Sequence, residues 1–269
     1  MLTARTFLVR GLLAGLIAGV VTFGVAYVIG EPPVASAISF EESQAAVEAP
    51  VADHEHEAAA GETAEHSHGD EEGSVSRENQ ATWGLATATV VFGIALGGIV
   101  GLAAAFAVGR LGRLSPRAST AVVAAGGFVS VYLVPYLKYP PNPPAVGNPD
   151  TIGDRTALYF TMLAVSVIAA IAALVLASRL NRTLGAWNAG LIAAGGYLVV
   201  VLITAWLLPV FDEVPADFSA DLLWQFRMAS LVVQAAMWAT IGVVLSTMIG
   251  SVVKRAMAQN GPVLASTSA

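Results

Sequence analysis

The chain has 269 residues, of which 56% are hydrophobic and only 12% are charged, against about 25% charged residues in soluble domains. A mean hydropathy of +0.70 and several apolar runs long enough to cross a hydrocarbon core of about 30 Å exclude a water-soluble globule. With no cysteine and a net charge of −6, the chain has no disulfide, thiolate nucleophile or Cys-ligated zinc, and nucleic acid is an unfavourable partner.

The apolar runs predict an all-α integral membrane protein with six transmembrane helices. These runs lack acidic and basic residues and are apolar all round, whereas the strands of a membrane barrel alternate apolar and polar residues. They cover residues 11–29, 83–108, 118–137, 157–177, 186–208 and 228–250. The chain then divides into an N-terminal helix (1–29), an acidic loop (30–82), a five-helix membrane domain (83–255) and a cytoplasmic tail (256–269).

The basic residues predict the orientation in the bilayer. Most of the 13 lie before the first span, after the sixth, or in two of the connections, at Arg5, Arg10, Arg110, Arg113, Arg117, Arg179, Arg182, Lys254 and Arg255. We expect the inner membrane of a prokaryote, and the positive-inside rule places both termini on its cytoplasmic side. An alternative is that residues 1–37, ending in Ala35-Ser36-Ala37, form a cleaved signal peptide, which would leave five spans.

Glycines recur at every fourth position in the first two spans. These tandem G-x-x-x-G motifs are Gly11, Gly15 and Gly19 in one helix and Gly93, Gly97 and Gly101 in the next. Such motifs let two helix backbones approach closely in lipid. We therefore expect a tight contact between the two helices, with ordinary small-residue packing elsewhere as the alternative.

The connection over residues 30–82 is acidic and contains every histidine of the chain. Its composition predicts a largely disordered or only locally helical extracytoplasmic loop. The histidines form two H-x-H pairs among carboxylates, His54 with His56 and His66 with His68. Imidazole with carboxylate suits divalent ions such as Co²⁺, Ni²⁺ and Zn²⁺, so we expect metal capture that weakens below about pH 6.5. The alternative is a solvated acidic linker.

Two shorter connections are expected on the same side of the membrane. Residues 138–155 hold several prolines and predict a stiff, extended segment. In the last connection, Asp217 and Asp221 would share a helix face if Pro215 began a helix. With Glu31, the acids of this connection could form an oxygen-rich metal site at the membrane boundary; helix capping and solvation are the alternative. The acids proposed for this site are Glu31, Asp212, Glu213 and Asp217.

The predicted spans contain no ionisable side chain, so they offer no proton relay or buried metal cage. Asn188 is one of their few polar residues. No G-x-x-x-x-G-K-[ST] motif is present, so any ATP hydrolysis would belong to another chain. Nothing in the spans suggests catalysis, and we expect a protein that is not an enzyme.

Several unusual strings resemble one family. They are VRGLLAG (9–15), GEPPV (30–34), YLVPYLKYPPNPP (132–144), DTIG (150–153), LGAWNA (184–189), DEVPADF (212–218) and LLWQFR (222–227). In these strings the chain resembles the CbtA-type probable cobalt transporter subunits over nearly its whole length. The resemblance marks further candidate transport residues, which are Lys138, Asn142, Asp150, Arg155, Asn188, Asp221, Trp224 and Arg227.

The resemblance implies a membrane subunit for cobalt uptake that supports cobalamin supply. Co²⁺ would be the substrate, with no permanently bound cofactor, and the expected partner is a small single-span CbtB-type subunit. That partner, or an oligomer, would supply the ligands that the spans lack. The rival hypothesis is a metal sensor or scaffold that does not transport.

Overall fold

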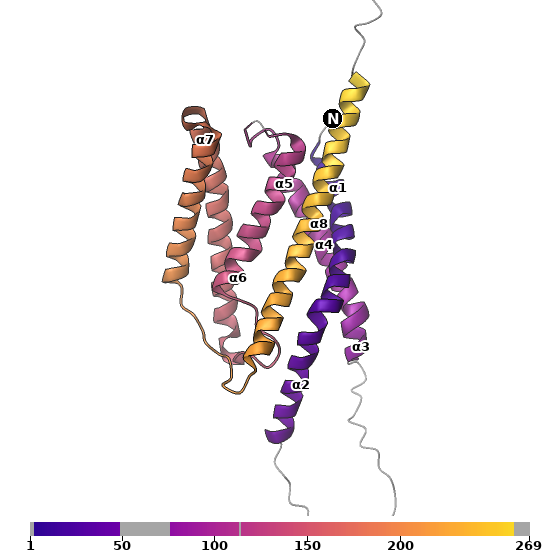
Figure 1. Cartoon of the computed structure of the whole chain (residues 1–269), viewed down its shortest axis with the longest axis vertical. Helices are drawn as coiled ribbons and strands as arrows, with labels where there is room; N and C mark the ends of the chain where they lie inside the picture. Colours follow the sequence, from indigo (N-terminus) through magenta and orange to yellow (C-terminus); the bar gives the residue numbers. More distant parts are fainter. Residues whose placement is uncertain (1–2, 49–75, 113, 261–269) are drawn as a thin grey trace, which may run out of the picture.

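The regular secondary structure in the described residues is entirely helical. The computed structural model describes residues 3–48, 76–112 and 114–260 (Figure 1). Its α-helices are α1 (Ala4–Val25), α2 (Glu31–Glu48), α3 (Arg77–Asn79), α4 (Leu85–Ala107), α5 (Pro116–Gly127), α6 (Val134–Lys138), α7 (Ile152–Leu207) and α8 (Ala220–Asn260). Short π- or 3₁₀-helical turns join several of them, namely η1 (Ala26–Gly30), η2 (Gln80–Gly84), η3 (Phe128–Leu133) and η4 (Pro149–Thr151).

Five helical stretches of this part of the chain are long and apolar enough to cross a membrane. They are Ala4–Ala46, Arg77–Ala107, Pro116–Lys138, Pro149–Leu207 and Ala220–Ala258. The expectation of an all-α membrane protein is confirmed at this level. The count differs from six because the expected spans 157–177 and 186–208 both fall within one continuous stretch.

The first helix is longer than the sequence predicts. Helix α1 begins at the cap Thr3, whose hydroxyl accepts a hydrogen bond from the N–H of Thr6 at 3.2 Å. Instead of ending at residue 29, the helical path continues through η1 into α2. In η1 the N–H of Glu31 donates to the carbonyl of Ala26, one residue further back than in an α-helix. This wider π turn lies directly before Pro32 and Pro33, whose missing N–H groups interrupt α-helical bonding.

Helices α1 and α4 pack with their backbones in close contact. A Cβ added at Gly15 would lie 2.0 Å from the carbonyl oxygen of Gly93, and one added at Gly11 would lie 2.3 Å from that of Gly97. Gly19 and Gly101 are similarly crowded by backbone atoms of the other helix. Only glycine fits at this distance, because a side chain at these positions would overlap the opposite backbone.

The main core lies where α8 crosses α1, α4 and α5. Side chains of α8 fill it, with Ile241, Leu245 and Ile249 fully buried. They pack against Phe7 of α1 and Val100 of α4, in a cluster that also includes Ala124 and Trp238. Four helices therefore form one block, to which the other long helix is attached.

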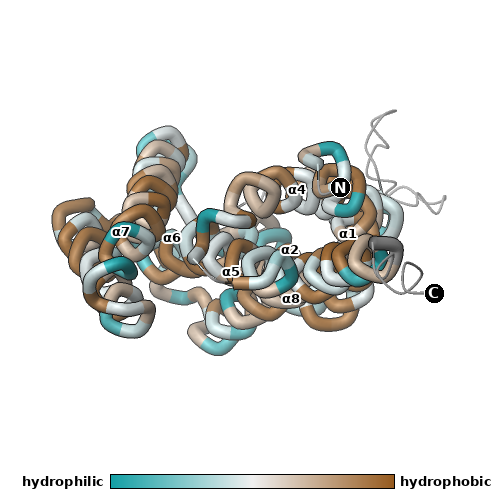
Figure 2. Tube along the Cα trace, turned by 90° about the horizontal axis from the view of Figure 1, so that it is seen from above, coloured by the Kyte–Doolittle hydropathy of each residue, from teal (hydrophilic) through white to brown (hydrophobic). Residues whose placement is uncertain are grey.

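Helix α7 contains a break at Gly185. This glycine has φ 76° and ψ 163°, which lies outside helical conformation, and Figure 1 shows α7 as two arms that meet in a turn. The hydroxyls of Ser166 and Tyr197 form a 2.9 Å hydrogen bond between the arms. Helix α7 packs mainly against α6 and η3, and Figure 2 shows it set to one side of the block.

The two ends of the bundle carry different connections. At the upper end in Figure 1 lie the start of α1, the α4–α5 connection, the turn of α7 and the end of α8. A Cβ added at Gly112, between α4 and α5, would lie 3.3 Å from the side-chain nitrogen of Asn181 in α7. We call this the basic end, and the opposite end, where Ala37, Val146 and Phe218 form a small core, the cavity end.

Candidate functional site

A cavity of about 1170 Å³ opens at the cavity end of the bundle. Its walls come from η1 and the start of α2, from η3 and α6, from the first turns of α7, and from α8 with the connection before it. Tyr132, Tyr136 and Tyr159 are among its lining residues. The charged residues of its wall are Glu31, Lys138, Arg155, Asp212, Glu213 and Arg227. All six are residues that sequence reasoning proposed for metal binding or transport.

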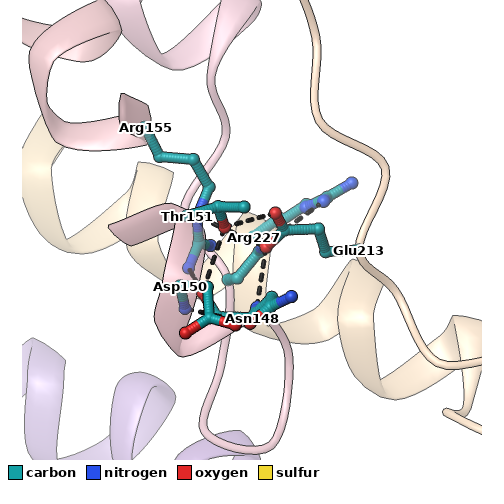
Figure 3. Close-up of polar contacts among 7 residues, drawn as sticks. Asn148, Asp150, Thr151, Arg155, Glu213 and Arg227 are labelled. Atoms are coloured by element: carbon teal, nitrogen blue, oxygen red, sulfur yellow. Dashed lines mark hydrogen bonds and ion pairs between the residues drawn. The ribbon is translucent and has the colours of Figure 1, made fainter. Parts of the chain in front are cut away.

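Glu213 is held by three groups from the segment around the start of α7 (Figure 3). The backbone N–H of Asn148 donates to Oε2 at 2.8 Å, and the hydroxyl of Thr151 donates to Oε1. The Nε of Arg155 lies 3.3 Å from Oε2, and 13% of the Glu213 side chain is exposed. The hydrogen bond from Thr151 lowers the pKa of Glu213 most, followed by the bond from Asn148 and the charge of Arg155.

The conformation of the Pro-rich segment, residues 138–155, brings these donors together. The side-chain oxygen of Asn148 accepts from the N–H of Asp150 at 2.9 Å and so caps the short turn η4. The backbone carbonyl of Asn148 accepts from Nη2 of Arg155 at 3.1 Å. Gly147 has φ 128°, and a Cβ there would lie 2.7 Å from Nη1 of Arg155. A glycine is needed here both for its backbone conformation and for the space that the guanidinium takes.

Arg227 lies in the first third of α8, and its partners within the described part of the chain are neutral. Its Nη2 donates to the side-chain oxygen of Asn142 at 3.1 Å. Its backbone carbonyl accepts from the hydroxyl of Tyr136 at 2.8 Å. Its Nε is buried and has no hydrogen-bond partner within the described residues. The predicted candidates Asn142 and Arg227 are therefore in contact, although they are far apart in the sequence.

Lys138 and Tyr139 lie at the beginning of the Pro-rich segment. The Lys138 ammonium lies 5.6 Å from the centre of the Tyr139 ring, a cation–π arrangement. The Tyr139 hydroxyl donates to the carbonyl of Pro209 at 2.7 Å, which ties this segment to the end of α7. Burial raises the pKa of Tyr139, so its phenol stays protonated at neutral pH.

Glu31 forms an ion pair across the wall of the cavity. Its Oε2 accepts from Nη2 of Arg77, and 17% of the Glu31 side chain is exposed. The pair joins the start of α2 to α3, the helix that follows the acidic segment. Arg77 was not among the predicted site residues. The signal that could have identified it is its position as the only base of the 30–82 connection.

Asp217 and Asp221 do not share a helix face. Helix α8 begins at Ala220 rather than at Pro215, because the hydroxyl of Ser219 accepts from the N–H of Leu222 at 3.3 Å and serves as the cap. Asp217 precedes the helix and accepts from the side-chain nitrogen of Gln44 on α2.

The remaining candidates lie away from the interior of the cavity. Asp150 and Asp221 are exposed, and 63% of Trp224 is exposed. Asn188 lies on the second arm of α7, where its amide donates to the carbonyl of Leu184 at 3.2 Å. None of these four residues lines the cavity.

The structure does not gather the acids into one group of metal ligands. Glu31, Asp212 and Glu213 line the same cavity. However, no cluster of three His, Asp or Glu side chains that could hold an ion occurs in residues 3–48, 76–112 and 114–260. His54, His56, His66 and His68 lie outside the described residues. Sequence reasoning also missed Asn148 and Thr151, whose donors occupy the oxygens of Glu213.

Comparison with known proteins gives one match. The model of the family described as "Probable cobalt transporter subunit (CbtA)" matches residues 4–250, which is nearly the whole chain. No curated protein and no solved structure matches the chain.

Proposed function

Since the chain belongs to the CbtA family of probable cobalt transporter subunits, we propose that it is the membrane subunit through which Co²⁺ is taken up for cobalamin supply. The observation that carries this proposal is the cavity of about 1170 Å³ at one end of a bundle of apolar helices. It is lined by charged side chains from four separated parts of the chain. A subunit that moves an ion needs such a polar opening where the bundle meets water.

We propose that the chain crosses the membrane six times, with both termini in the cytoplasm. The stretch Pro149–Leu207 has 59 residues, which at about 1.5 Å a residue is far longer than a hydrocarbon core of about 30 Å. Its break at Gly185 gives two arms, each long enough for one span. The proximity of Gly112 and Asn181 supports placing both Arg-containing connections on one side, which the positive-inside rule makes cytoplasmic.

We propose that the cavity end faces outward and receives the ion. Residues 49–75 contain His54, His56, His66 and His68 and join α2 to α3, and both of these helices lie at the cavity end (Figure 1). Histidine pairs among carboxylates suit capture of Co²⁺. Because imidazole coordinates only when neutral, capture weakens as pH falls below about 6.5.

The onward path needs ligands that the spans do not supply. A bare ion in hydrocarbon is very costly. We propose that a small single-span subunit of the CbtB type, or a second copy of this chain, completes the path. The chain itself acts as a transport subunit, with Co²⁺ as its substrate and no permanent cofactor.

The test is cell-associated cobalt, measured by elemental mass spectrometry at low external Co²⁺ with and without the small partner. The substitutions Glu31→Gln and Asp212→Asn change carboxylates that line the cavity and should lower energy-dependent accumulation. Asp217→Asn is the matched control, because Asp217 lies outside the cavity wall. If cobalt binds to the cells but does not accumulate inside them, and if deletion of residues 53–72 abolishes this binding, the rival hypothesis of a metal sensor or scaffold would be established instead.

A further inference from the structure

The carboxylates and the cations of the cavity wall differ in how they are paired. Glu213 accepts from Asn148 and Thr151 and lies against Arg155. Glu31 is paired with Arg77. Both oxygens of Glu213 and one oxygen of Glu31 are therefore already occupied by donors of the protein. Only Asp212 remains among the acids of the wall, and it is exposed.

Two cations of the wall have no carboxylate partner in the described part of the chain. Arg227 contacts the amide oxygen of Asn142, and Lys138 contacts the ring of Tyr139. The charge available to a ligand inside the cavity is thus positive. An arginine whose partners are neutral keeps its charge available to a planar carboxylate, the group that a guanidinium binds best.

Three buried donors of the same wall make no hydrogen bond within residues 3–48, 76–112 and 114–260: the Nε of Arg155, the Nε of Arg227 and the hydroxyl of Tyr132. The Nε of Arg155 faces the carboxylate of Glu213 at 3.3 Å, whereas the other two have no acceptor in that part of the chain. Leaving a buried donor unsatisfied is costly, and such groups in a native structure call for an explanation. Arg227 and Tyr132 both line the cavity, so rotation of their ends toward an oxygen-bearing anion seated there would give each donor an acceptor.

The size of the cavity also exceeds what a hydrated ion needs. A divalent ion with six waters takes about 200 Å³, at about 30 Å³ for each water. The cavity is several times larger, at about 1170 Å³, slightly above the range of about 300–1,000 Å³ for sites that bind small organic molecules. A free divalent cation would in addition be repelled by Lys138 and Arg227.

We propose that this cavity binds a carboxylate-bearing anion at Arg227, Lys138 and Tyr132, and that the metal reaches it as an anionic carboxylate chelate. The proposal of an anion site rests only on the contacts observed in the cavity wall. The statement about the metal rests on the proposed transport function. Carboxylates could arrive as free anions or on the chelate, and the two arms of the experiment separate these sources.

The first arm measures binding without metal. The full chain, purified into lipid nanodiscs, is titrated with citrate by calorimetry at neutral pH. Arg227→Gln should weaken binding about tenfold or more, the loss expected for a charge-assisted hydrogen bond. Arg255→Gln on the same helix removes the same charge outside the cavity and should leave binding unchanged. If citrate does not bind the wild-type chain, or binds it and both variants equally, the anion site is overturned.

A second variant, Tyr132→Phe, keeps the test valid if the arginine variant misfolds. It removes one oxygen without removing a charge, and it should weaken citrate binding about two- to tenfold, as for one neutral hydrogen bond. Lys138→Gln should weaken it by a similar amount. Citrate affinity that is unaffected by both substitutions would place the ligand elsewhere.

The second arm compares uptake of cobalt supplied as the chloride and as the citrate chelate, at equal total metal, in cells that express the chain and its partner. Faster uptake of the chelate, lost in Arg227→Gln, supports the inference. Uptake of the chloride alone, insensitive to Arg227→Gln, overturns it and leaves the transport function standing. Citrate binding without uptake of either form would overturn the transport function and the chelate step, while the anion site would stand.

Discussion

The Nε of Arg155 lies 3.3 Å from Oε2 of Glu213, and this contact joins the first turn of α7 to the connection that precedes α8. The same carboxylate accepts from the backbone N–H of Asn148. Two segments that are far apart in the sequence, residues 148–155 and the connection before α8, therefore meet at one side chain. The start of α7 is thus held to that connection through polar contacts.

Replacing this acid should loosen the cavity end. In Glu213→Gln the charge that attracts Arg155 is lost, and one oxygen becomes an amide nitrogen that cannot accept from Thr151 or Asn148. We expect a lower midpoint of thermal unfolding for the purified protein in detergent. Asp212→Asn is the control, because Asp212 is exposed; an equal effect of the two substitutions would contradict this role for Glu213.

The pH dependence of stability should identify the same group. The pKa of Glu213 is lowered on folding from its ordinary value of 4.5. A depressed folded pKa means that the contribution of this group is complete above about pH 4.5 and is lost as pH falls further. The wild-type midpoint should therefore fall towards that of Glu213→Gln when unfolding is followed from pH 6 to pH 3. A constant difference between them over this range would disprove the assignment.

The contact of α1 with α4 should tolerate no side chain at its centre. In Gly15→Ala the new Cβ would lie 2.0 Å from the carbonyl of Gly93, so the helices must separate. We expect a loss of about 1–3 kcal/mol, as in other overpacked interfaces. Gly24→Ala on the same helical path is the matched control, since no atom lies within 4 Å of its added Cβ. Unfolding by denaturant titration in mixed micelles would measure both.

The break of α7 should depend on glycine through backbone strain alone. No atom lies within 4 Å of a Cβ added at Gly185, but its φ is 76°. We expect Gly185→Ala to destabilise the protein by about 1–3 kcal/mol. Gly190→Ala, in the helical arm that follows and equally uncrowded, should be neutral or stabilising by about 0.5–1 kcal/mol. Equal thermal midpoints for the two variants would show that the turn does not need glycine.

The histidines should matter most when cobalt is scarce. Replacing His54, His56, His66 and His68 by alanine should lower uptake at low external Co²⁺ and leave it nearly unchanged at saturating Co²⁺, because only capture is affected. The wild-type advantage should disappear below about pH 6.5, where imidazole is protonated. Uptake by the quadruple variant that equals wild type at every cobalt concentration would remove the histidines from the path.

The fold was predictable wherever the length of an apolar run determines the structure. Residues 83–108 were expected as a span, and helix covers them to Ala107 through η2 and α4. The expected span ended at residue 29 because the apolar run stops before Glu31. The helix nevertheless continues through η1 into α2, since the π turn before Pro32 and Pro33 keeps the helical path intact. Spacing alone could not predict that Ser219 rather than Pro215 would start α8.

Which residues line the cavity was more predictable from the sequence than which of them are paired with one another. Glu31, Asp212 and Glu213 were expected together and do line one cavity. Which carboxylates are already paired depends on contacts such as Glu31 with Arg77 and Glu213 with Thr151, between residues far apart in the chain. Sequence reasoning counted these acids as free metal ligands. Only the folded arrangement reveals that, among the residues that the structure describes, Arg227 and Lys138 have no carboxylate partner.

The sparse packing of α7 has a consequence for how the protein responds to its surroundings. Of the five long helical stretches, the one that includes α7 has the smallest buried share, and its protein neighbours are mainly α6 and η3. A hydrophobic stretch with few packed neighbours adjusts to the thickness of the bilayer by tilting. Since α7 supplies one wall of the cavity, ligand affinity should vary with acyl-chain length, and a micelle and a thick membrane will present differently shaped sites.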